Sequence, residues 1–498
     1  MYKKIVSIFI VLLMLLMPLS ACLASENNKI YDSYMDDISK QNKDLNNHIT
    51  ADKDGENTLV ITGYDKLSKY IDTNASKFIE SHPYVDIIND SSEDISNYTD
   101  NFSVRIMTEN LGDIVFLPGN ISYKNINDAY FLDLSSFVEN DKDINDENYF
   151  MNILTGGANE DGLFFLTSGV GIMDYCLMRN DISDDLTEKF ETKVDLTYDD
   201  LLDIYFEYNE KLDDDEKWVF LEFYDPFSYS RYKADSLIDY ENKKANFYDV
   251  DFMANMEKVK KDLLTSFDIK YTADGPVGSI YSSTDFLGDL TDENGDYMFY
   301  SNLGGIKHYY LDLKEKCFSK PRLLQTAGGK YSYAPHGIIA INKNTSNPEL
   351  AWEFVKCLIG EKEELQYLRD SNMESNMKLI KILENMLTFF PINKKNFELV
   401  ADIELKNNWE IALRYSSRNK DGRYDITGTF EDYKKSYLDG IYEIISEYNY
   451  CKLNDDEVFG VNSGSIVYHD MYLYVTDQQS IEQTMLNIQN KIEIWLNE

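Results

Sequence analysis

Short apolar segments alternate with amphipathic helical segments between residues 58 and 120. The apolar segments lie at 58–63, 84–90 and 112–120, each closed by a glycine, a polar turn or both. Apolar residues recur at helical spacing through 66–83, between the first two segments. Strands and helices that alternate with short loops predict a parallel sheet covered by helices. The chain is therefore expected to fold in the α/β class.

The same alternation continues along the rest of the chain. Thr197 and Asp200 have the spacing of a capping box, which predicts the start of a helix. Pro348 occupies the first turn of another predicted helix, where its missing N–H costs nothing. The further elements predicted from apolar periodicity are a helix at 196–212, a helix within 240–263, a strand at 337–341 and a C-terminal helix at 478–498.

The N-terminal segment has the ordered parts of a secretory leader. Two lysines precede an apolar run at 5–19, which is shorter than the roughly 20 residues that cross a bilayer. The sequence LSAC then ends at Cys22 and resembles the bacterial lipobox, whose cysteine receives a diacylglycerol group before cleavage. An ordinary leader with an incidental cysteine is the alternative. We expect residues 1–21 to be removed and Cys22 to anchor the chain at the extracellular face of the membrane.

Length and charge limit what the remainder can be. The polar stretch 22–56 is rich in Asn and Asp and is expected to be a flexible tether. Roughly 440 residues follow it, too many for one hydrophobic core, so two lobes are expected.

The formal net charge of −40 argues against a nucleic-acid partner. The four remaining cysteines are far apart without a CxxC motif and are expected to be thiols: Cys176, Cys317, Cys357 and Cys451.

Sequence patterns for catalysis are absent. The chain has no G-x-S-x-G, P-loop or dinucleotide-binding glycine motif, and its five histidines show no H-x-x-x-H pairing. The stretch 417–428 contains Asn419, Asp421 and Asp425 but has Gly428 where a calcium loop needs glutamate, so a polar turn is the preferred interpretation. We expect no catalytic residue, no metal and no cofactor, with a secreted glycosidase using two of the many carboxylates as the competing class.

Several separated stretches resemble one known family in their order. They are TGYD, KFIESHPYVDI, GDIVFL, AYFLDLSSFVEND, LTYDDLLDIY, GIIAINKNTSNPELAWEFVKCLI and FPINKKNFE. From about residue 57 onward, the chain resembles the extracellular solute-binding proteins that serve carbohydrate-type ABC importers. The resemblance implies a two-lobe, periplasmic-binding-protein-like (type II) fold with a hinge and a ligand cleft between the lobes. It places 57–168 and 337–388 in an N-terminal lobe and 169–336 and 389–498 in a C-terminal lobe, with crossings near 166–172, 333–338 and 389–393.

The resemblance also implies a function, which is capture of a small solute for delivery to ABC permease subunits by a monomeric protein. An oligosaccharide is the expected cargo, because tyrosine offers sugars both a flat apolar face and a hydroxyl, and the chain has 38 tyrosines. A non-sugar cargo or a sensor on the same fold is the alternative. This alternative is favoured by the sequence CLMRN at 176–180, where the family usually has Tyr-Tyr-Asn.

The expected ligand-binding residues come from three kinds of position. Some follow strands of the first sheet, because ligands bind beyond the carboxyl ends of strands in open α/β sheets. Others lie near the first two crossings, and others match an acid-proline-aromatic order that the family carries in its second lobe. The set is Tyr64, Asp65, Asn120, Asp174, Tyr175, Tyr224, Asp225, Phe227, His308, Tyr309 and Tyr333.

The lipobox-like sequence leads to the first prediction. Replacing Cys22 by serine removes the thiol that would carry the lipid, so Cys22→Ser is expected to leave the protein unlipidated and mostly uncleaved at this site. Mass spectrometry of the membrane-extracted protein measures both the lipidation and the cleavage. A wild-type mature N-terminus without lipid would contradict the prediction.

Overall fold

The computed structural model describes most of the chain from residue 57 onward. The described residues are 57–497 apart from 120, 122–124, 173–174, 180–181, 214–217, 222–225, 240–241, 267–269, 273–274, 278–296, 301–321, 364, 367–389, 417–428, 454–455 and 460–464. Within this part of the chain, every helix is too short or too polar to span a bilayer.

The first sheet begins with three parallel strands, as the alternation predicted. β1 pairs with β2 on one side and with β3 on the other, in parallel register. α2 follows β1 and α3 follows β2, so the predicted helix at 66–83 is confirmed with slightly shifted ends. These elements are β1 (Thr58–Thr62), α2 (Asp65–Ser81), β2 (Asp86–Asp90), α3 (Ile95–Met107) and β3 (Ile114–Phe116).

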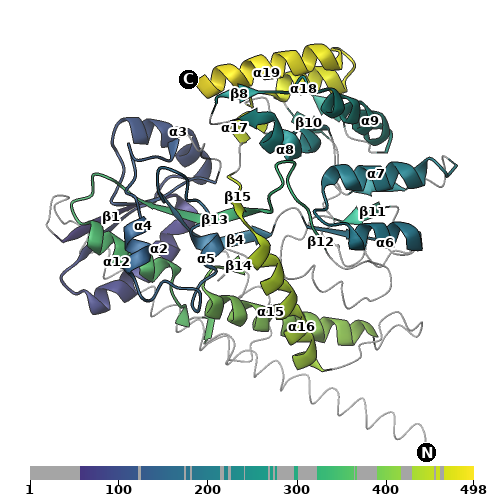
Figure 1. Cartoon of the computed structure of the whole chain (residues 1–498). Coiled ribbons are helices and arrows are strands. Elements are labelled where there is room, and N and C mark those ends of the chain that lie inside the picture. Colours follow the sequence, from purple (N-terminus) through teal and green to yellow (C-terminus); the bar gives the residue numbers. More distant parts are fainter. Residues whose placement is uncertain are drawn as a thin grey trace, which may run out of the picture.

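Strands from much later in the chain complete this sheet in the order β14-β4-β13-β3-β1-β2, with β15 also paired to β13. β13 lies antiparallel between β3 and β4, while β15 pairs with its N-terminal end in parallel. Figure 1 shows β13 crossing the middle of the molecule. The added strands are β4 (Leu166–Ile172), β13 (Ser332–Ile341), β14 (Phe390–Pro391) and β15 (Tyr450–Cys451).

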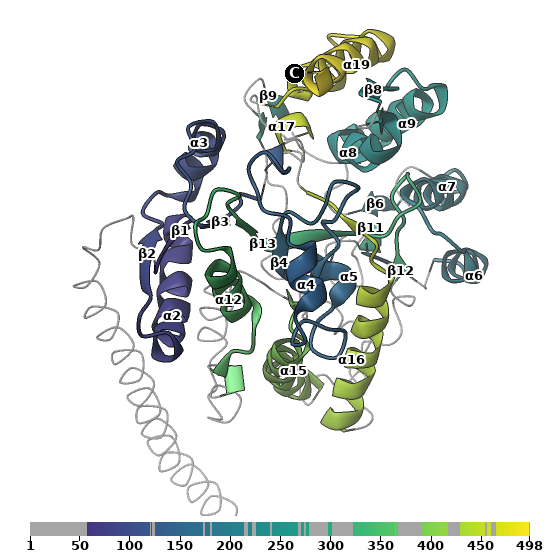
Figure 2. The ribbon, with the colours of Figure 1, turned by 60° about the vertical axis from the view of Figure 1, so that its left-hand side comes forward.

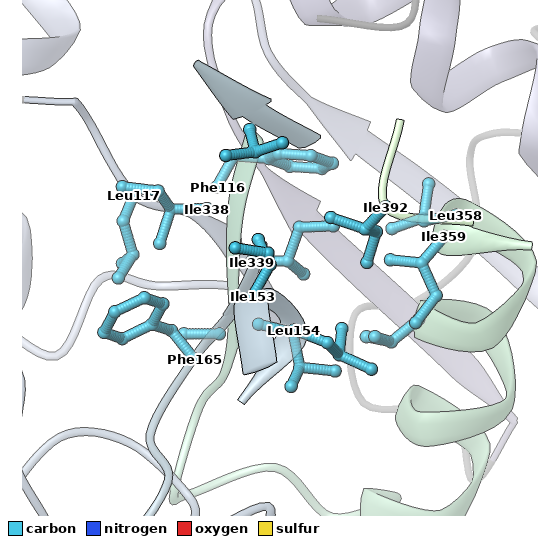
Figure 3. Close-up of a cluster of buried hydrophobic side chains, with 14 of the residues drawn as sticks. Phe116, Leu117, Ile153, Leu154, Phe165, Ile338, Ile339, Leu358, Ile359 and Ile392 are labelled. Atoms are coloured by element: carbon cyan, nitrogen blue, oxygen red, sulfur yellow. The ribbon is translucent and has the colours of Figure 1, made fainter. Parts of the chain in front are cut away.

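A hydrophobic core surrounds the first sheet. Ile339 of β13 packs with Ile153 and Leu154 of α5, and Leu358 of α12 lies beside them (Figure 3). α12 begins directly after Asn347 with Pro348 in its first turn, as predicted, and buries the apolar face that includes Trp352. The helices on this core, besides α2 and α3, are α4 (Ser135–Asn140), α5 (Met151–Leu154), α12 (Pro348–Ile359), α15 (Lys394–Ser416) and α16 (Phe430–Glu447).

A second sheet has its own core. Its strand order is β12-β5-β11-β6, and most of the buried side chains around it form a second hydrophobic cluster, whereas Leu177 of β5 and Leu323 of β12 pack with the first. Thr197 and Asp200 form the predicted capping box at the start of α7. The strands are β5 (Tyr175–Met178), β6 (Val219–Leu221), β11 (Tyr297–Tyr300) and β12 (Arg322–Leu323). The helices are α6 (Asp184–Thr192), α7 (Tyr198–Asn209), α8 (Pro226–Leu237), α9 (Val250–Ser266), α17 (Asp456–Phe459), α18 (Tyr468–Val475) and α19 (Ile481–Asn497). Two small ribbons, β7 (Ile238–Asp239) with β8 (Lys244–Ala245) and β9 (Lys270–Thr272) with β10 (Gly275–Val277), also lie in this part of the chain.

Among the described residues, three connections join the two cores. The chain passes from β4 to β5, from β12 to β13, and finally from β15 to α17 (Figure 1). β14, α15 and α16 remain with the first core, because Phe397 packs edge-on against both Phe150 and Tyr442. The third connection therefore follows residue 451 and not 389–393. The residue ranges given above for whole lobes otherwise stay a prediction.

The central position of β13 leads to a stability prediction. Ile339 has no solvent exposure, so Ile339→Ala leaves a cavity and is expected to lower the free energy of unfolding by about 2–5 kcal/mol. Urea denaturation followed by circular dichroism measures this loss. Ile494→Ala is the matched control, because that side chain is 61% exposed and its truncation should change stability by less than about 0.5 kcal/mol. Equal losses in the two variants would contradict the assignment of the core.

Candidate functional site

The carboxyl ends of β2, β1 and β3 meet at one edge of the first sheet, because the three strands are parallel. The backbone at the end of β1 is fixed to the neighbouring strand, since Gly63 N donates to Asp90 O over 3.1 Å. Tyr64 follows in an extended conformation and α2 starts at Asp65. This edge is where ligands bind in open α/β sheets, so we take it as the candidate site.

Tyr64 and Asp65 present different chemistry at this edge. The Tyr64 ring is half-buried and lies 5.8 Å from the ring of Tyr98. Burial, together with the charge of Asp65, raises the pKa of the Tyr64 hydroxyl, so it remains a neutral hydrogen-bonding group. Asp65 is exposed, and its carboxylate accepts from the adjacent Lys66 N at 2.8 Å. A stacking surface and an exposed acceptor therefore stand next to each other.

His336 lies in the strand pair that leads to the second sheet. Its backbone is held at both polar groups, because its N–H donates to Thr167 Oγ1 (3.2 Å) and its carbonyl accepts from the same hydroxyl (2.7 Å). A Cβ at Gly171 would lie 2.8 Å from His336 Nε2, so a side chain there would require the imidazole to move. Burial lowers the pKa of the His336 imidazole. The ring is therefore held neutral against the backbone of β4.

Two of the expected ligand residues are packed inside the cores. Tyr333 is fully buried, and its hydroxyl donates to Ile153 O over 2.9 Å. Phe227 is 2% exposed and stacks on Tyr468, with ring centroids 5.2 Å apart. Burial of a large ring in a well-packed core is strongly favourable, which accounts for both positions. In this structure neither side chain reaches the candidate site.

The remaining expected residues are placed only in part. Tyr175 belongs to β5, where it pairs with Leu323 of β12, at the entry to the second sheet. The others lie outside the described residues, and their roles stay predictions: Asn120, Asp174, Tyr224, Asp225, His308 and Tyr309. Cys22 and Asp421 also lie outside them.

Three residues described in this structure, His336, Tyr98 and Arg105, were not predicted from the sequence. His336 had a usable signal, because it is the one side chain in the expected crossing 333–338 that titrates near neutral pH. Tyr98 and Arg105 are seven residues apart, which places them on one face of a helix. That spacing is visible in the sequence, but nothing in the sequence indicates which residues these two side chains contact.

The described residues offer no metal site, since no group of three or more His, Cys, Asp or Glu side chains converges among them. Cys176 and Cys451 are buried and Cys357 is half-buried, and each of these three is a thiol.

Comparisons with known proteins identify the fold. No protein-family model matches the sequence, and no match was found among the curated proteins. The solved structure of the sugar-binding protein MalE from Xanthomonas citri is similar, with a TM-score of 0.51 and 11% identity, over 88% of this chain and 97% of MalE. An extracellular solute-binding protein of family 1 from Alicyclobacillus acidocaldarius gives a TM-score of 0.49 at 14% identity, over 89% of this chain and 98% of that protein. A periplasmic oligogalacturonide binding protein from Yersinia enterocolitica gives a TM-score of 0.48 at 13% identity, over 88% of this chain and 99% of that protein. The likeness to MalE shows that the chain has the periplasmic-binding-protein-like α/β fold, as predicted.

The partly buried His336 leads to a pH prediction. Its pKa is lowered in the folded chain relative to about 6.5 when unfolded, so protonation favours unfolding. The stability that neutral His336 supports is complete above pH 6.5 and is lost as the pH falls through the folded pKa. The difference in free energy of unfolding between wild type and His336→Asn is therefore expected to be largest at pH 8 and to shrink toward pH 5. Urea unfolding at four pH values tests this, and a difference that does not vary with pH would contradict it.

Proposed function

We propose that this chain is an extracellular, lipid-anchored solute-binding protein that captures an oligosaccharide and delivers it to an ABC importer. The observation that carries the proposal is the architecture. Two separately packed cores, joined by strand connections, adopt a fold that is shared with the sugar-binding protein MalE. The fold is compatible with other tasks, so the proposal also rests on the side chains of the candidate site.

The two cores support capture by closure. Most buried side chains belong to one core only, and the two from the second sheet that pack with the first core, Leu177 and Leu323, lie beside the connections. In the proposal the two cores therefore rotate relative to each other as largely intact units. The β4–β13 pair and β15 carry the connections and absorb the rotation. In this mechanism a ligand that binds better to the closed arrangement shifts the population toward it, and no covalent bond is made or broken.

The side chains of the candidate site suit a sugar. The half-buried ring of Tyr64 offers an apolar face for the C–H surface of a pyranose, and the exposed carboxylate of Asp65 accepts hydrogen bonds from hydroxyls. In the proposal, groups from the second lobe complete the site, and Tyr175, Tyr224 and Asp225 are the expected contributors. Asn120, Asp174, His308 and Tyr309 are retained as expected ligand contacts.

The proposed location rests on the N-terminal sequence. Cys22 within LSAC would receive the lipid, and 22–56 would separate the folded body from the membrane. The partners are then a small-molecule ligand, the permease subunits of an importer and the membrane itself. We propose that the protein acts as a monomer.

A non-sugar cargo, or a sensor on the same fold, is the second candidate, and one observation favours it. Where the family usually has Tyr-Tyr-Asn, this chain has Cys176, Leu177 and Met178, all buried in β5. These side chains cannot contact a ligand in this structure. The first lobe and the loops of the second must then provide the specificity.

Ligand screening tests the proposal directly. A thermal-shift panel of neutral oligosaccharides, galacturonides, amino sugars and short peptides is expected to show a raised melting temperature with a neutral oligosaccharide, because binding stabilises the native state. Titration calorimetry with that sugar should then show Asp65→Asn and Tyr64→Ala each weakened by about 10- to 150-fold, as for the loss of a hydrogen bond to a charged group or of a stacking contact.

Tyr84→Ala is the matched control for Tyr64→Ala. Tyr84 is 61% exposed and precedes β2, which places it at the opposite edge of the sheet, so its removal should leave affinity unchanged. A panel in which only peptides or other non-sugars bind would favour the second candidate. Hydrolysis of glycosides that a single carboxylate substitution abolishes would overturn both.

A further inference from the structure

A network of side chains joins the ends of β2, β1 and β3 behind the candidate site. Asp90 is the last residue of β2, and Phe116 is the last residue of β3. Tyr64 and Asp65 follow β1, and Glu93 lies in the loop after β2. α3 crosses close to these three strand ends (Figure 2). Its side chains Tyr98 and Arg105 make the connections between them, and Asn101 also donates to Glu93 Oε1 over 3.0 Å.

Tyr98 connects the end of β3 to Tyr64. It is fully buried, and its hydroxyl donates to Phe116 O over 2.8 Å. The ring centroid of Tyr98 lies 5.8 Å from that of Tyr64 at an interplanar angle of 49°. An aromatic pair at this separation has a preferred orientation. The direction in which Tyr64 presents its ring therefore depends on where Tyr98 is held.

Arg105 connects the same ring to β2. Its guanidinium lies 5.8 Å from the Tyr98 ring centroid and is paired with Asp90 Oδ2 at 3.3 Å and Glu93 Oε2 at 3.0 Å. The carbonyl of Glu93 in turn accepts from Asp65 N over 2.8 Å. One side chain thus touches the supports of both Tyr64 and Asp65.

The charge and exposure of this network fit a role in orientation more than in overall stability. The carboxylates of Asp90 and Glu93 are 42% and 30% exposed, and ion pairs so accessible to water contribute little to folding. A planar guanidinium holds two carboxylates and an aromatic face in fixed directions, which a lysine ammonium does not.

We propose that Arg105 is a positioning residue that, through Tyr98 and Glu93, sets the orientation of Tyr64 and Asp65 for ligand binding. The inference rests on the proposed function for the meaning of that orientation. The geometry of the network does not depend on it. The two are therefore tested by separate measurements on the full-length protein.

The positioning role is tested without ligand. Fluorotyrosine is incorporated at position 64 for ¹⁹F NMR, and hydrogen exchange is followed at the amides of 63–67, which include the Asp65 N–H. Arg105→Gln is expected to move or broaden the ¹⁹F resonance and to speed exchange of the Asp65 amide about three- to fivefold. Arg105→Lys should restore exchange in part and the resonance less, because lysine keeps the charge and loses the planar fork. An unchanged resonance and unchanged exchange in Arg105→Gln would overturn the proposal.

Controls separate local positioning from general loss of structure. Exchange at Ile339–Ile341 of β13 should be the same in all variants, and faster exchange there would mean that Arg105 acts on the fold, which also overturns the proposal. Lys434→Gln removes an ion pair with Asp402 on the α15–α16 pair and should leave the Tyr64 resonance unchanged. Tyr98→Phe removes only the bond to Phe116 O and should move the resonance less than Arg105→Gln.

The ligand measurement uses maltotriose as the probe. If wild type binds it, Arg105→Gln should weaken binding about three- to tenfold with Arg105→Lys between the two, and equal affinity in all three would contradict the positioning role. If wild type does not bind maltotriose, that result excludes this sugar as the cargo, the binding comparison is repeated with the sugar that the thermal-shift panel selects, and the ¹⁹F and exchange data still decide the role of Arg105.

Discussion

The pairing of β13 with β3 and β4 is the contact on which the rest of the molecule depends. It brings residues 332–341 between strands that ended more than 150 residues earlier, with Ile341 opposite Ile114 and Tyr333 opposite Ile172. Its C-terminal half supplies the fully buried Ile339–Ile341 to the first core, and its N-terminal half continues toward the second sheet. One strand therefore completes a core and carries a connection between cores.

Much of the first lobe follows from local patterns. The apolar periodicity of 66–83 and the short segments around it predict α2 and the parallel β1–β3 arrangement, and the capping box at Thr197 is formed as expected. Elements that are held in place by tertiary contacts cannot be predicted from local patterns. β15 is two residues long and has no periodicity to detect, and α15 stays with the first core because of where Phe397 packs. The third connection could not be located from sequence for this reason.

The candidate site was predicted less well than the fold, and the reason is chemical. A tyrosine that stacks on a sugar and a tyrosine that fills a core are the same residue in a sequence, and only burial distinguishes half-buried Tyr64 from fully buried Tyr333. The carboxyl-end rule selected Tyr64 and Asp65 because it rests on strand direction, which periodicity does predict. The support behind them depends on partners from α3 and the loop after β2, and such partners are set by the folded arrangement alone.

The route of the chain through the two cores also bears on how the protein is made. The first core draws side chains from Leu59 through Leu453, and the second draws them from Cys176 through Trp495, so the two are interleaved along the sequence. Domains usually fold as units, beginning with the N-terminal one while synthesis continues. Here neither unit has all of its parts until almost the whole chain has emerged. If the chain crosses a membrane N-terminus first, neither core can be completed until nearly all of it has crossed. The chain would therefore stay incompletely folded, and so able to cross, during nearly the whole passage.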